Sequence, residues 1–283
     1  MTSPVRIIRL TEPQQFAESA RVQRSAWGLE QSGEVPAHVL TAIQHHSGLV
    51  LGAYERGIMV GVLFGFTALD AGRPYHYSHV TGVARQHQSR GVGFRLKLAQ
   101  RRHVLRQSQE LVKWTYDPLQ AGNAYFNIGK LGAVCRVYKR NLYGRLEDSL
   151  NRGRITDRFE IEWLLKSRRV LERIRGAWRP MTLDQALSNG ARLLNNTEWV
   201  GPRVRRPTRA HLGLRHDQLL FEIPENIVKA ADFNSQLANE WTLHARRVFE
   251  TYFQRGYAAT DIVLDKTKTE KRMYYLLEKN LKL

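Results

Sequence analysis

The residues with the clearest chemical potential form the string R-Q-H-Q-S-R-G-V-G, from Arg85 to Gly93. The string holds two arginines, two glycines and no carboxylate, so its charge favours an anionic ligand. Glycine lets a backbone turn come close to a ligand, and the first amides of a helix have no partner within that helix. A helix start attracts an anion by roughly 0.3–1 kcal/mol when it is exposed. We therefore predict a phosphate-binding loop.

The flanking residues predict a strand before this loop and a helix after it. Val80, Thr81 and Val83 are typical strand formers, and residues 94–105 are good helix formers. The spacing differs from the G-x-x-x-x-G-K-[ST] of a P-loop and from the G-x-G-x-x-G of a dinucleotide-binding fold. The simpler alternative is an ordinary glycine-rich turn between strand and helix.

Hydrophobic patterns predict the other elements of the first half of the chain. We expect strands at residues 5–10, 49–54, 58–68, 110–117, 133–142 and 158–165. We expect helices from residue 13 to 27, over 36–45 and over 123–131.

The string from Gln88 to Gly93 reads Q-x-x-G-x-G and follows Val83, and this resembles the coenzyme A signature of the GNAT acyltransferase superfamily. The order of expected elements over most of residues 1–166 is similar to the GNAT order. Further strings resemble a bacterial and archaeal GNAT branch whose members are known mainly as predicted acetyltransferases. They are W-T-Y-D-P-L at 114–119, K-L-G-A at 130–133, T-D-R-F at 156–159 and E-W at 162–163.

The resemblance implies an α/β fold with a mixed, mostly antiparallel central sheet and flanking helices. It also implies direct transfer of an acyl group, acetyl first among the options, from acyl-coenzyme A to an amine acceptor that the sequence does not identify, without a metal. In the family, the signature strand contacts the pantetheine arm and the loop amides hold the pyrophosphate. The corresponding cofactor-binding residues are Val83, Gln88, Ser89, Arg90, Gly91, Val92, Gly93 and Asn123. By charge alone, Arg90 and Lys97 are candidates to pair with phosphate groups.

The catalytic residues are less well defined by the resemblance. Direct transfer needs a base for the acceptor proton and an acid for the leaving thiolate. His79 and Asp117 are the candidate bases, although His79 could be a strand histidine that only hydrogen-bonds and Asp117 a turn former. The usual family tyrosine falls near Lys130 in this sequence. The substitutes are Tyr125, Tyr138 and Tyr143, with Tyr138 the first choice.

The residues from 168 onward predict a second, smaller α/β unit. We therefore expect two domains, formed by residues 1–167 and 168–283. Residues 167–180 are arginine-rich and suit a linker, followed by strands at 191–195, 218–223 and 257–264 and a long helix at 234–255. Strand, loop, long helix and strand repeat the arrangement of residues 76–117 without its glycine signature. We therefore expect a degenerate half-GNAT unit that holds no second cofactor.

The composition leaves two other function classes open. The formal net charge of +18 attracts polyanions, so nucleic-acid association through Arg203, Arg205, Arg206, Arg209 and Arg215 is an alternative, though not the favoured one. The second alternative is a noncatalytic coenzyme A-binding module or sensor. An acyltransferase whose acceptor is a small anion would also account for the positive charge.

Simple features of the sequence narrow its class further. Cys135 is the only cysteine, which excludes an internal disulfide and any multi-cysteine zinc site. It is expected to be a core residue. No apolar run reaches the roughly 18–20 residues of a membrane helix, and no signal-peptide core opens the chain, so we expect a cytoplasmic protein. The oligomeric state stays open, and a dimer is compatible with the sequence.

Overall fold

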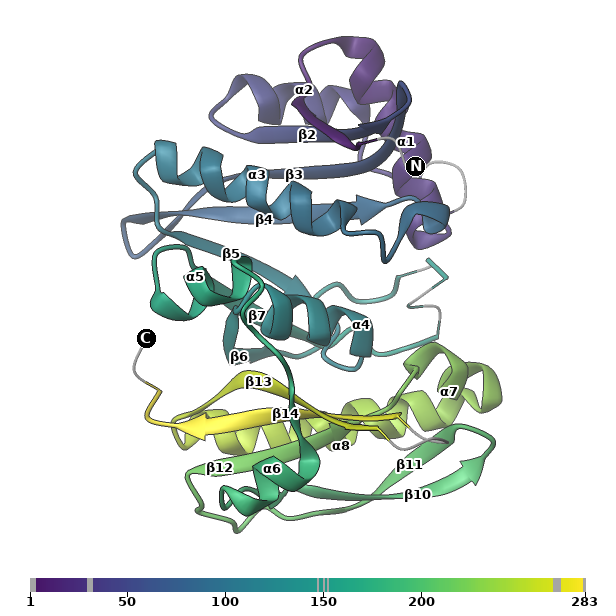
Figure 1. Cartoon of the computed structure of the whole chain (residues 1–283). Helices are drawn as coiled ribbons and strands as arrows, with labels where there is room; N and C mark the ends of the chain where they lie inside the picture. Colours follow the sequence, from purple (N-terminus) through teal and green to yellow (C-terminus); the bar gives the residue numbers. More distant parts are fainter. Residues whose placement is uncertain are drawn as a thin grey trace. The chain divides into compact units, whose positions relative to one another are not determined.

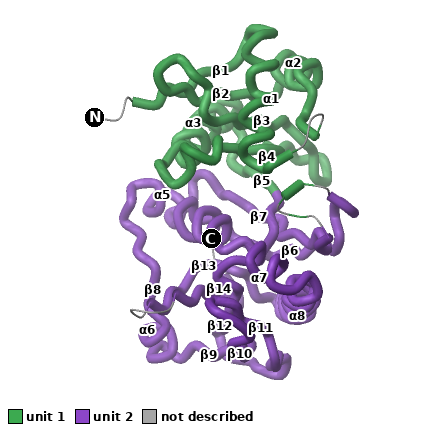
Figure 2. The backbone as a smooth tube through the Cα atoms, turned by 90° about the vertical axis from the view of Figure 1, so that its right-hand side faces the viewer, with its two compact units in different colours: residues 1–114, 147–152 green, residues 115–146, 153–283 purple. Residues whose placement is uncertain are grey.

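The computed structural model describes residues 4–29, 33–146, 148–149, 151, 153–266 and 271–281. The chain divides into two compact units (Figure 2). Unit 1 consists of Met1–Trp114 and Glu147–Arg152, and unit 2 consists of Thr115–Leu146 and Gly153–Leu283. The predicted boundary between residues 167 and 168 lies inside unit 2, and as a boundary between independently folding domains it stays a prediction.

Unit 1 is a sheet with the strand order β1-β2-β3-β4-β5 and helices on both faces (Figure 1). Neighbouring strands are antiparallel except β4 and β5, which are parallel. The strands are β1 Arg6–Arg9, β2 Leu49–Glu55, β3 Ile58–Asp70, β4 Arg73–Val83 and β5 Leu111–Tyr116, whose last two residues belong to unit 2. The helices are α1 Pro13–Trp27, α2 Ala37–His45 and α3 Val92–Arg106. These bounds confirm the strands and helices predicted for this part of the chain.

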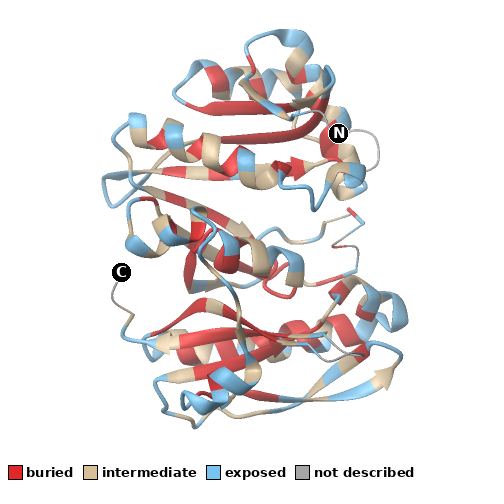
Figure 3. Ribbon diagram, viewed as in Figure 1, coloured by how far each residue is buried: buried red, intermediate tan, exposed pale blue. Residues whose placement is uncertain are grey.

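Two apolar clusters fill the two faces of this sheet, because alternate strand residues point to opposite sides. Phe16 and Val22 of α1 and Leu40 of α2 pack on one face, against Val62 and Phe64 of β3. On the other face, Val92 and Leu96 of α3 pack against Leu51, Val60 and Leu63. Figure 3 shows the buried residues concentrated on the strands and on the helix sides that cover them. Unit 1 therefore has three layers, with α1 and α2 opposite α3.

Unit 2 contains a second run of sheet, in the order β7-β6-β13-β14-β12-β9, and a separate two-stranded ribbon. Strand β8 pairs with β13. The strands are β6 Val134–Lys139, β7 Arg158–Leu164, β8 Met181–Thr182, β9 Arg192–Leu193, β12 Gln218–Ile223, β13 Tyr257–Lys266 and β14 Lys271–Lys279, with β10 Asn195–Gly201 and β11 Val204–Ala210 in the ribbon. The helices are α4 Ala121–Ala124, which continues as the π-helix Tyr125–Lys130, then α5 Arg168–Ile174, α6 Leu183–Ser188, α7 Ile227–Phe233 and α8 Ser235–Gln254.

The C-terminal part of unit 2 repeats the topology that begins with β5. Along the chain, β5 is followed by α4, β6 and β7, and β12 is followed by α7, α8, β13 and β14. In both segments the last strand lies between the other two strands in the sheet, in the orders β5-β7-β6 and β12-β14-β13. Pro118 precedes α4 by the same spacing at which Pro224 precedes α7. The strands predicted at 218–223 and 257–264 are confirmed. The predicted echo of residues 76–117 is corrected, because β4 and β5 are neighbours whereas β14 separates β12 from β13.

Other parts of unit 2 also differ from the sequence-based expectation. Residues 167–180 are not simply a linker, because they contain α5, whose start is capped when Ser167 Oγ accepts a hydrogen bond from the amide of Val170. The strand expected at 191–195 is split between β9 and the start of β10. No helix within the described residues is long and apolar enough to cross a membrane.

Candidate cofactor and catalytic site

The predicted phosphate-binding loop lies in unit 1 between β4 and α3. A single 3-10 turn covers Arg85–His87, and Ser89 and Gly91 then take left-handed backbone conformations with φ of 62° and 80°. Gly91 is the residue before α3, and no side chain within the described ranges caps that helix start. The first amides of α3 are therefore available to a ligand. A Cβ at Gly91 would meet no atom within 4 Å, so the space beside it is open.

Hydrogen bonds from the loop hold its shape and leave its cations unpaired. Gln88 Nε2 donates to the carbonyl oxygen of Val83 at 3.0 Å, and the amide of Arg85 donates to Ser25 Oγ at 3.2 Å. Arg85, Arg90 and Arg95 are exposed, and no carboxylate among residues 4–29, 33–146 and the other described ranges pairs with them. The loop thus presents guanidinium groups and helix amides together, which suits a phosphate group.

Lys97 lies under α3 rather than at the loop, so the prediction that it pairs with phosphate is wrong. Its side chain is 1% exposed. Nζ donates to Ser78 Oγ at 2.8 Å and to Gln100 Oε1 at 3.2 Å, and it lies 3.7 Å from the centre of the Trp114 ring. Burial lowers the pKa of Lys97 well below its usual value. The helical position that follows the loop points this amine toward the sheet, where no phosphate can reach it.

His76 shares the same buried region. It is fully buried, and neither ring nitrogen has a hydrogen-bond partner among the described residues. Burial first, and then the nearby Lys97 and His103 charges, lower the pKa of His76 to about 3. The ring is therefore neutral at pH 7.

His79, a predicted base, occupies a β-bulge. Phe64 of β3 is opposite Val80, but the next residue, Gly65, is opposite Ser78, so His79 is the extra residue of β4. A bulge re-aims a side chain and is common beside active sites. The His79 ring lies 5.5 Å from Phe64 and 6.1 Å from Tyr77, on the face that α1 and α2 cover. Its surface is exposed, yet enough protein surrounds it for desolvation to lower its pKa.

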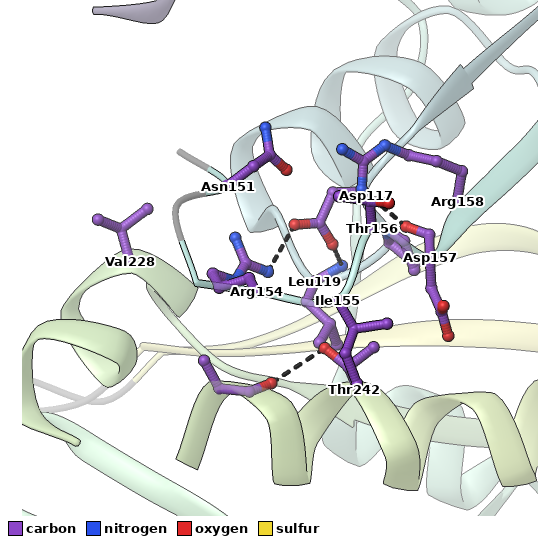
Figure 4. Close-up of polar contacts among 12 residues, drawn as sticks. Asp117, Leu119, Asn151, Arg154, Ile155, Thr156, Asp157, Arg158, Val228 and Thr242 are labelled. Carbon is purple, nitrogen blue, oxygen red and sulfur yellow. Dashed lines mark hydrogen bonds and ion pairs between the residues drawn. The ribbon is translucent and has the colours of Figure 1, made fainter. Parts of the chain in front are cut away.

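Asp117, the other predicted base, belongs to unit 2 and already has partners (Figure 4). Its Oδ2 accepts from Arg154 NH2 at 2.7 Å, and its Oδ1 accepts from the amide of Leu119 at 2.9 Å. Both charged side chains are buried. This buried ion pair stabilises the turn at Pro118, and breaking such a pair typically costs about 3–5 kcal/mol.

Tyr138 of β6 donates its hydroxyl hydrogen to Asp157 Oδ2 at 2.9 Å. Asp157 also accepts two hydrogen bonds of 2.8 Å from Arg246 of α8 and one from the amide of Asn141. Burial, and then the Asp157 charge, raise the pKa of Tyr138 well above its usual value. The phenol is thus a neutral group fixed in a network that joins β6 to α8.

The remaining sequence candidates are spread over unit 2. Asn123 is exposed on α4. Tyr125 packs against Trp178 with ring centres 5.2 Å apart, and Tyr143 shares a 2.7 Å hydrogen bond with Thr115. Cys135 is fully buried and its pKa is raised well above the usual value by burial, as expected for a core thiol. No group of three His, Cys, Asp or Glu side chains that could hold a metal occurs in the described part of the chain.

Two features of this site were not predicted from the sequence. The bulge at His79 depends on how β3 and β4 pair, and its only local signal is Gly65 of β3 at the register shift, because a glycine inside a strand often marks a bulge. The side-chain partner of Asp117 is Arg154, 37 positions away, and that of Tyr138 is Asp157, 19 positions away. By contrast, Arg158 of the T-D-R-F string makes a local contact, because its NH1 donates a hydrogen bond to the carbonyl oxygen of the preceding residue, Asp157.

Comparison with known proteins gives similarities of fold only. No protein-family model matches the chain, and no curated protein matches it. The ribosomal-protein-S18-alanine N-acetyltransferase of Escherichia coli is 14% identical, over 58% of this chain and 96% of that protein, with a TM-score of 0.47. An aminoglycoside 6'-acetyltransferase type Ii is 15% identical, over 58% and 99%, with a TM-score of 0.46. A GNAT-family acetyltransferase of Streptococcus pneumoniae is 13% identical, over 56% and 98%, with a TM-score of 0.45.

Proposed function

We propose that the protein is an acyl-coenzyme A-dependent N-acyltransferase, with acetyl-coenzyme A as the first cofactor to test. The observation that carries this proposal is the exposed, carboxylate-free loop at the start of α3. It combines the uncapped helix amides after Gly91 with the exposed cations Arg85, Arg90 and Arg95, with which no described carboxylate forms an ion pair. The pyrophosphate of coenzyme A carries the charge that such a loop favours.

The proposed reaction needs one proton acceptor and one proton donor. The acceptor nitrogen forms a bond to the thioester carbonyl carbon, the carbon–sulfur bond breaks, and the sulfur leaves with a proton as coenzyme A thiol. His79 is the group that takes the proton from the nitrogen, because it projects from the β4 bulge and its lowered pKa keeps it neutral at pH 7. A general base of this kind contributes roughly 10²–10⁴-fold to a rate.

Asp117 and Tyr138 stay predicted catalytic residues, but their contacts favour positioning roles. Asp117 already pairs with the buried Arg154 at 2.7 Å. The Tyr138 proton points to Asp157, and the raised pKa of the phenol opposes its release. If Tyr138 is the acid, Tyr138→Phe will slow turnover while cofactor affinity stays near normal. An unchanged turnover would assign the hydroxyl to structure alone.

Calorimetry with coenzyme A and acetyl-coenzyme A, followed by mass spectrometry of reactions with a panel of amines, tests the proposal. We expect saturable binding and at least one acetylated amine together with free coenzyme A thiol. Tight binding without any acylated product over a broad panel would identify a coenzyme A-binding module or sensor instead. Absence of binding would refute the loop assignment itself.

A further inference from the structure

A second basic site lies in unit 2, beside α5. A cavity of about 400 Å³ opens there, within the size range of small-molecule sites. Its walls include Arg168, Arg169 and Arg173 from α5, and Ala177 and Trp178 from the chain that follows. None of these residues belongs to the loop before α3, and none was a candidate for the transfer reaction.

Arg169 is a half-buried cation whose hydrogen bonds all go to neutral carbonyl groups. Its Nε donates to the carbonyl oxygen of Gly132 at 3.1 Å, and its NH2 donates to that of Thr260. Within the described residues no carboxylate forms an ion pair with it. Burial, and then the charge of Arg173, lower the pKa of Arg169 to about 10. The charges of Asp261 and Glu278 act in the opposite direction and offset this lowering only in part, so an anion in contact with the guanidinium would stabilise the folded protein.

Arg173 has one donor without a partner. Its NH2 donates to Asp261 Oδ2 at 2.6 Å, and its guanidinium lies 4.7 Å from the centre of the Trp178 ring. Trp178 Nε1 donates to the other oxygen of Asp261 at 3.1 Å. The side chain is 8% exposed, and its NH1 is buried without any hydrogen-bond acceptor among the described residues. This nitrogen has almost no accessible surface, so a ligand in the cavity would feel the charge of Arg173 without a direct hydrogen bond to NH1.

The carboxylates near the cavity are already engaged. Asp261 serves both Arg173 and Trp178, and Glu172 pairs with Arg168 at 2.8 Å. Neither carboxylate forms an ion pair with Arg169. The fixed guanidinium planes favour an oxyanion with several acceptor oxygens, and arginine recognises phosphate well because its donors form a rigid fork.

We propose that this cavity binds a small phosphate-bearing ligand through Arg169 and Arg173. A phosphate oxygen accepts from NH1 of Arg169, which has no hydrogen-bond partner among the described residues, and the nearby positive charge of Arg173 adds to the attraction. The Trp178 ring, held by Asp261 on one side and packed against Tyr125 on the other, forms a flat wall beside it. The site is separate from the coenzyme A loop in sequence and belongs entirely to unit 2.

The test introduces the missing negative charge into the protein itself. Ala177→Glu places a carboxylate in the wall of the cavity, and Ala177→Gln is its uncharged match of almost the same shape. Both are made in the full-length chain with Gly91→Trp, so that phosphate binding at the loop does not contribute. Thermal unfolding is followed against inorganic phosphate at constant ionic strength, with sodium chloride as the balance.

We expect phosphate to raise the melting temperature of the Gly91→Trp protein and its Ala177→Gln derivative by ~2–5 °C, with saturation. The Ala177→Glu derivative should melt higher without phosphate and respond to it little. Parallel titrations with adenosine monophosphate and acetate show whether a phosphate ester binds better than free phosphate, and acetate should be weaker than both. The proposal is overturned if phosphate has no effect on the parent protein, if Glu and Gln at 177 respond alike, or if acetate equals phosphate.

Discussion

The loop before α3 and the β10–β11 ribbon are both rich in arginine, but most of the ribbon arginines have carboxylate partners, whereas those of the loop have none among the described residues. In the ribbon and its turn, Arg206 pairs with Glu198 at 3.0 Å, Arg205 lies 3.4 Å from Glu222, and Arg203 pairs with Glu225. Arg205 also lies over the Trp199 ring at 4.5 Å. In the loop, no described carboxylate pairs with Arg85, Arg90 or Arg95.

This difference shows why net charge is a poor guide to partners. The formal charge of +18 counts every arginine equally, but an arginine that already has a carboxylate partner adds little attraction for an outside phosphate. The nucleic-acid alternative relied on Arg203, Arg205, Arg206, Arg209 and Arg215. The first three have carboxylate partners, whereas Arg209 and Arg215 are exposed and form no ion pair with the described residues, so only two of the five cations stay available. The loop has fewer cations, yet they stand at a helix start, and no described carboxylate pairs with Arg85, Arg90 or Arg95. Glu55 contacts the loop at 3.0 Å, but through His87.

The largest effect should come from filling the open space beside the loop. Gly91→Trp should weaken coenzyme A binding by more than 100-fold, because a side chain at this left-handed position enters the space that the pyrophosphate needs. Calorimetry gives the affinity. Gly72→Trp is the matched control, since Gly72 has φ of 79°, also meets nothing within 4 Å, and lies in the β3–β4 turn. Equal losses in the two variants would remove the loop from the site.

Replacement of His79 tests the chemistry without disturbing the loop. His79→Gln should lower kcat by roughly 10²–10³-fold and change coenzyme A affinity little, because the base acts in transfer and not in binding. In the unmodified protein the rate should fall only as the pH drops below the usual histidine range, since the His79 pKa is lowered. That pH dependence should vanish in His79→Gln. A rate unaffected by the substitution would assign His79 to packing.

A pair of arginine substitutions tests the comparison directly. Arg90→Ala should weaken coenzyme A binding by roughly 10-fold, the effect of losing one hydrogen bond from a charged group. Arg206→Ala in the ribbon should leave it unchanged and should not create binding to DNA or RNA at low salt. If Arg206→Ala affects cofactor affinity as much as Arg90→Ala, the distinction between paired and unpaired arginines fails.

The smallest effect concerns the folding stability of the protein and depends on the buried His76 of β4. His76 has a pKa of about 3 in the folded protein, below the usual 6.5, so the unfolded chain takes up its proton first as the pH falls. Folding stability should therefore decline from pH 6.5 toward pH 3, by at most about 1.4 kcal/mol per pH unit from this group. Urea unfolding at several pH values measures the slope. His76→Leu should flatten it, and an identical slope in the variant would contradict the assignment.

The strands, turns and helix starts of unit 1 could be predicted from short stretches of the sequence. Gly91 and the residues around it specify a strand, a turn and a helix start without help from the rest of the chain. The mixed α/β class and the bounds of most strands in unit 1 followed from hydrophobic alternation and from turn residues such as Gly57 and Gly72, which have positive φ. Patterns of this kind act over a few residues, so they can be read without knowledge of the fold.

Which charged side chains are exposed and which are already paired depends on contacts between distant segments, so it becomes visible only in the folded structure. Lys97 and Arg90 have the same formal charge in the sequence. Lys97 lies on the side of α3 that faces the sheet and is buried, whereas Arg90 lies in the loop before α3 and is exposed. Asp117 and Tyr138 were predicted for proton transfer, but Arg154 and Asp157 engage them from other segments. The bulge that projects His79 exists only because β3 and β4 pair in a particular register. Such contacts join residues distant in the chain, and the local sequence carries no record of them.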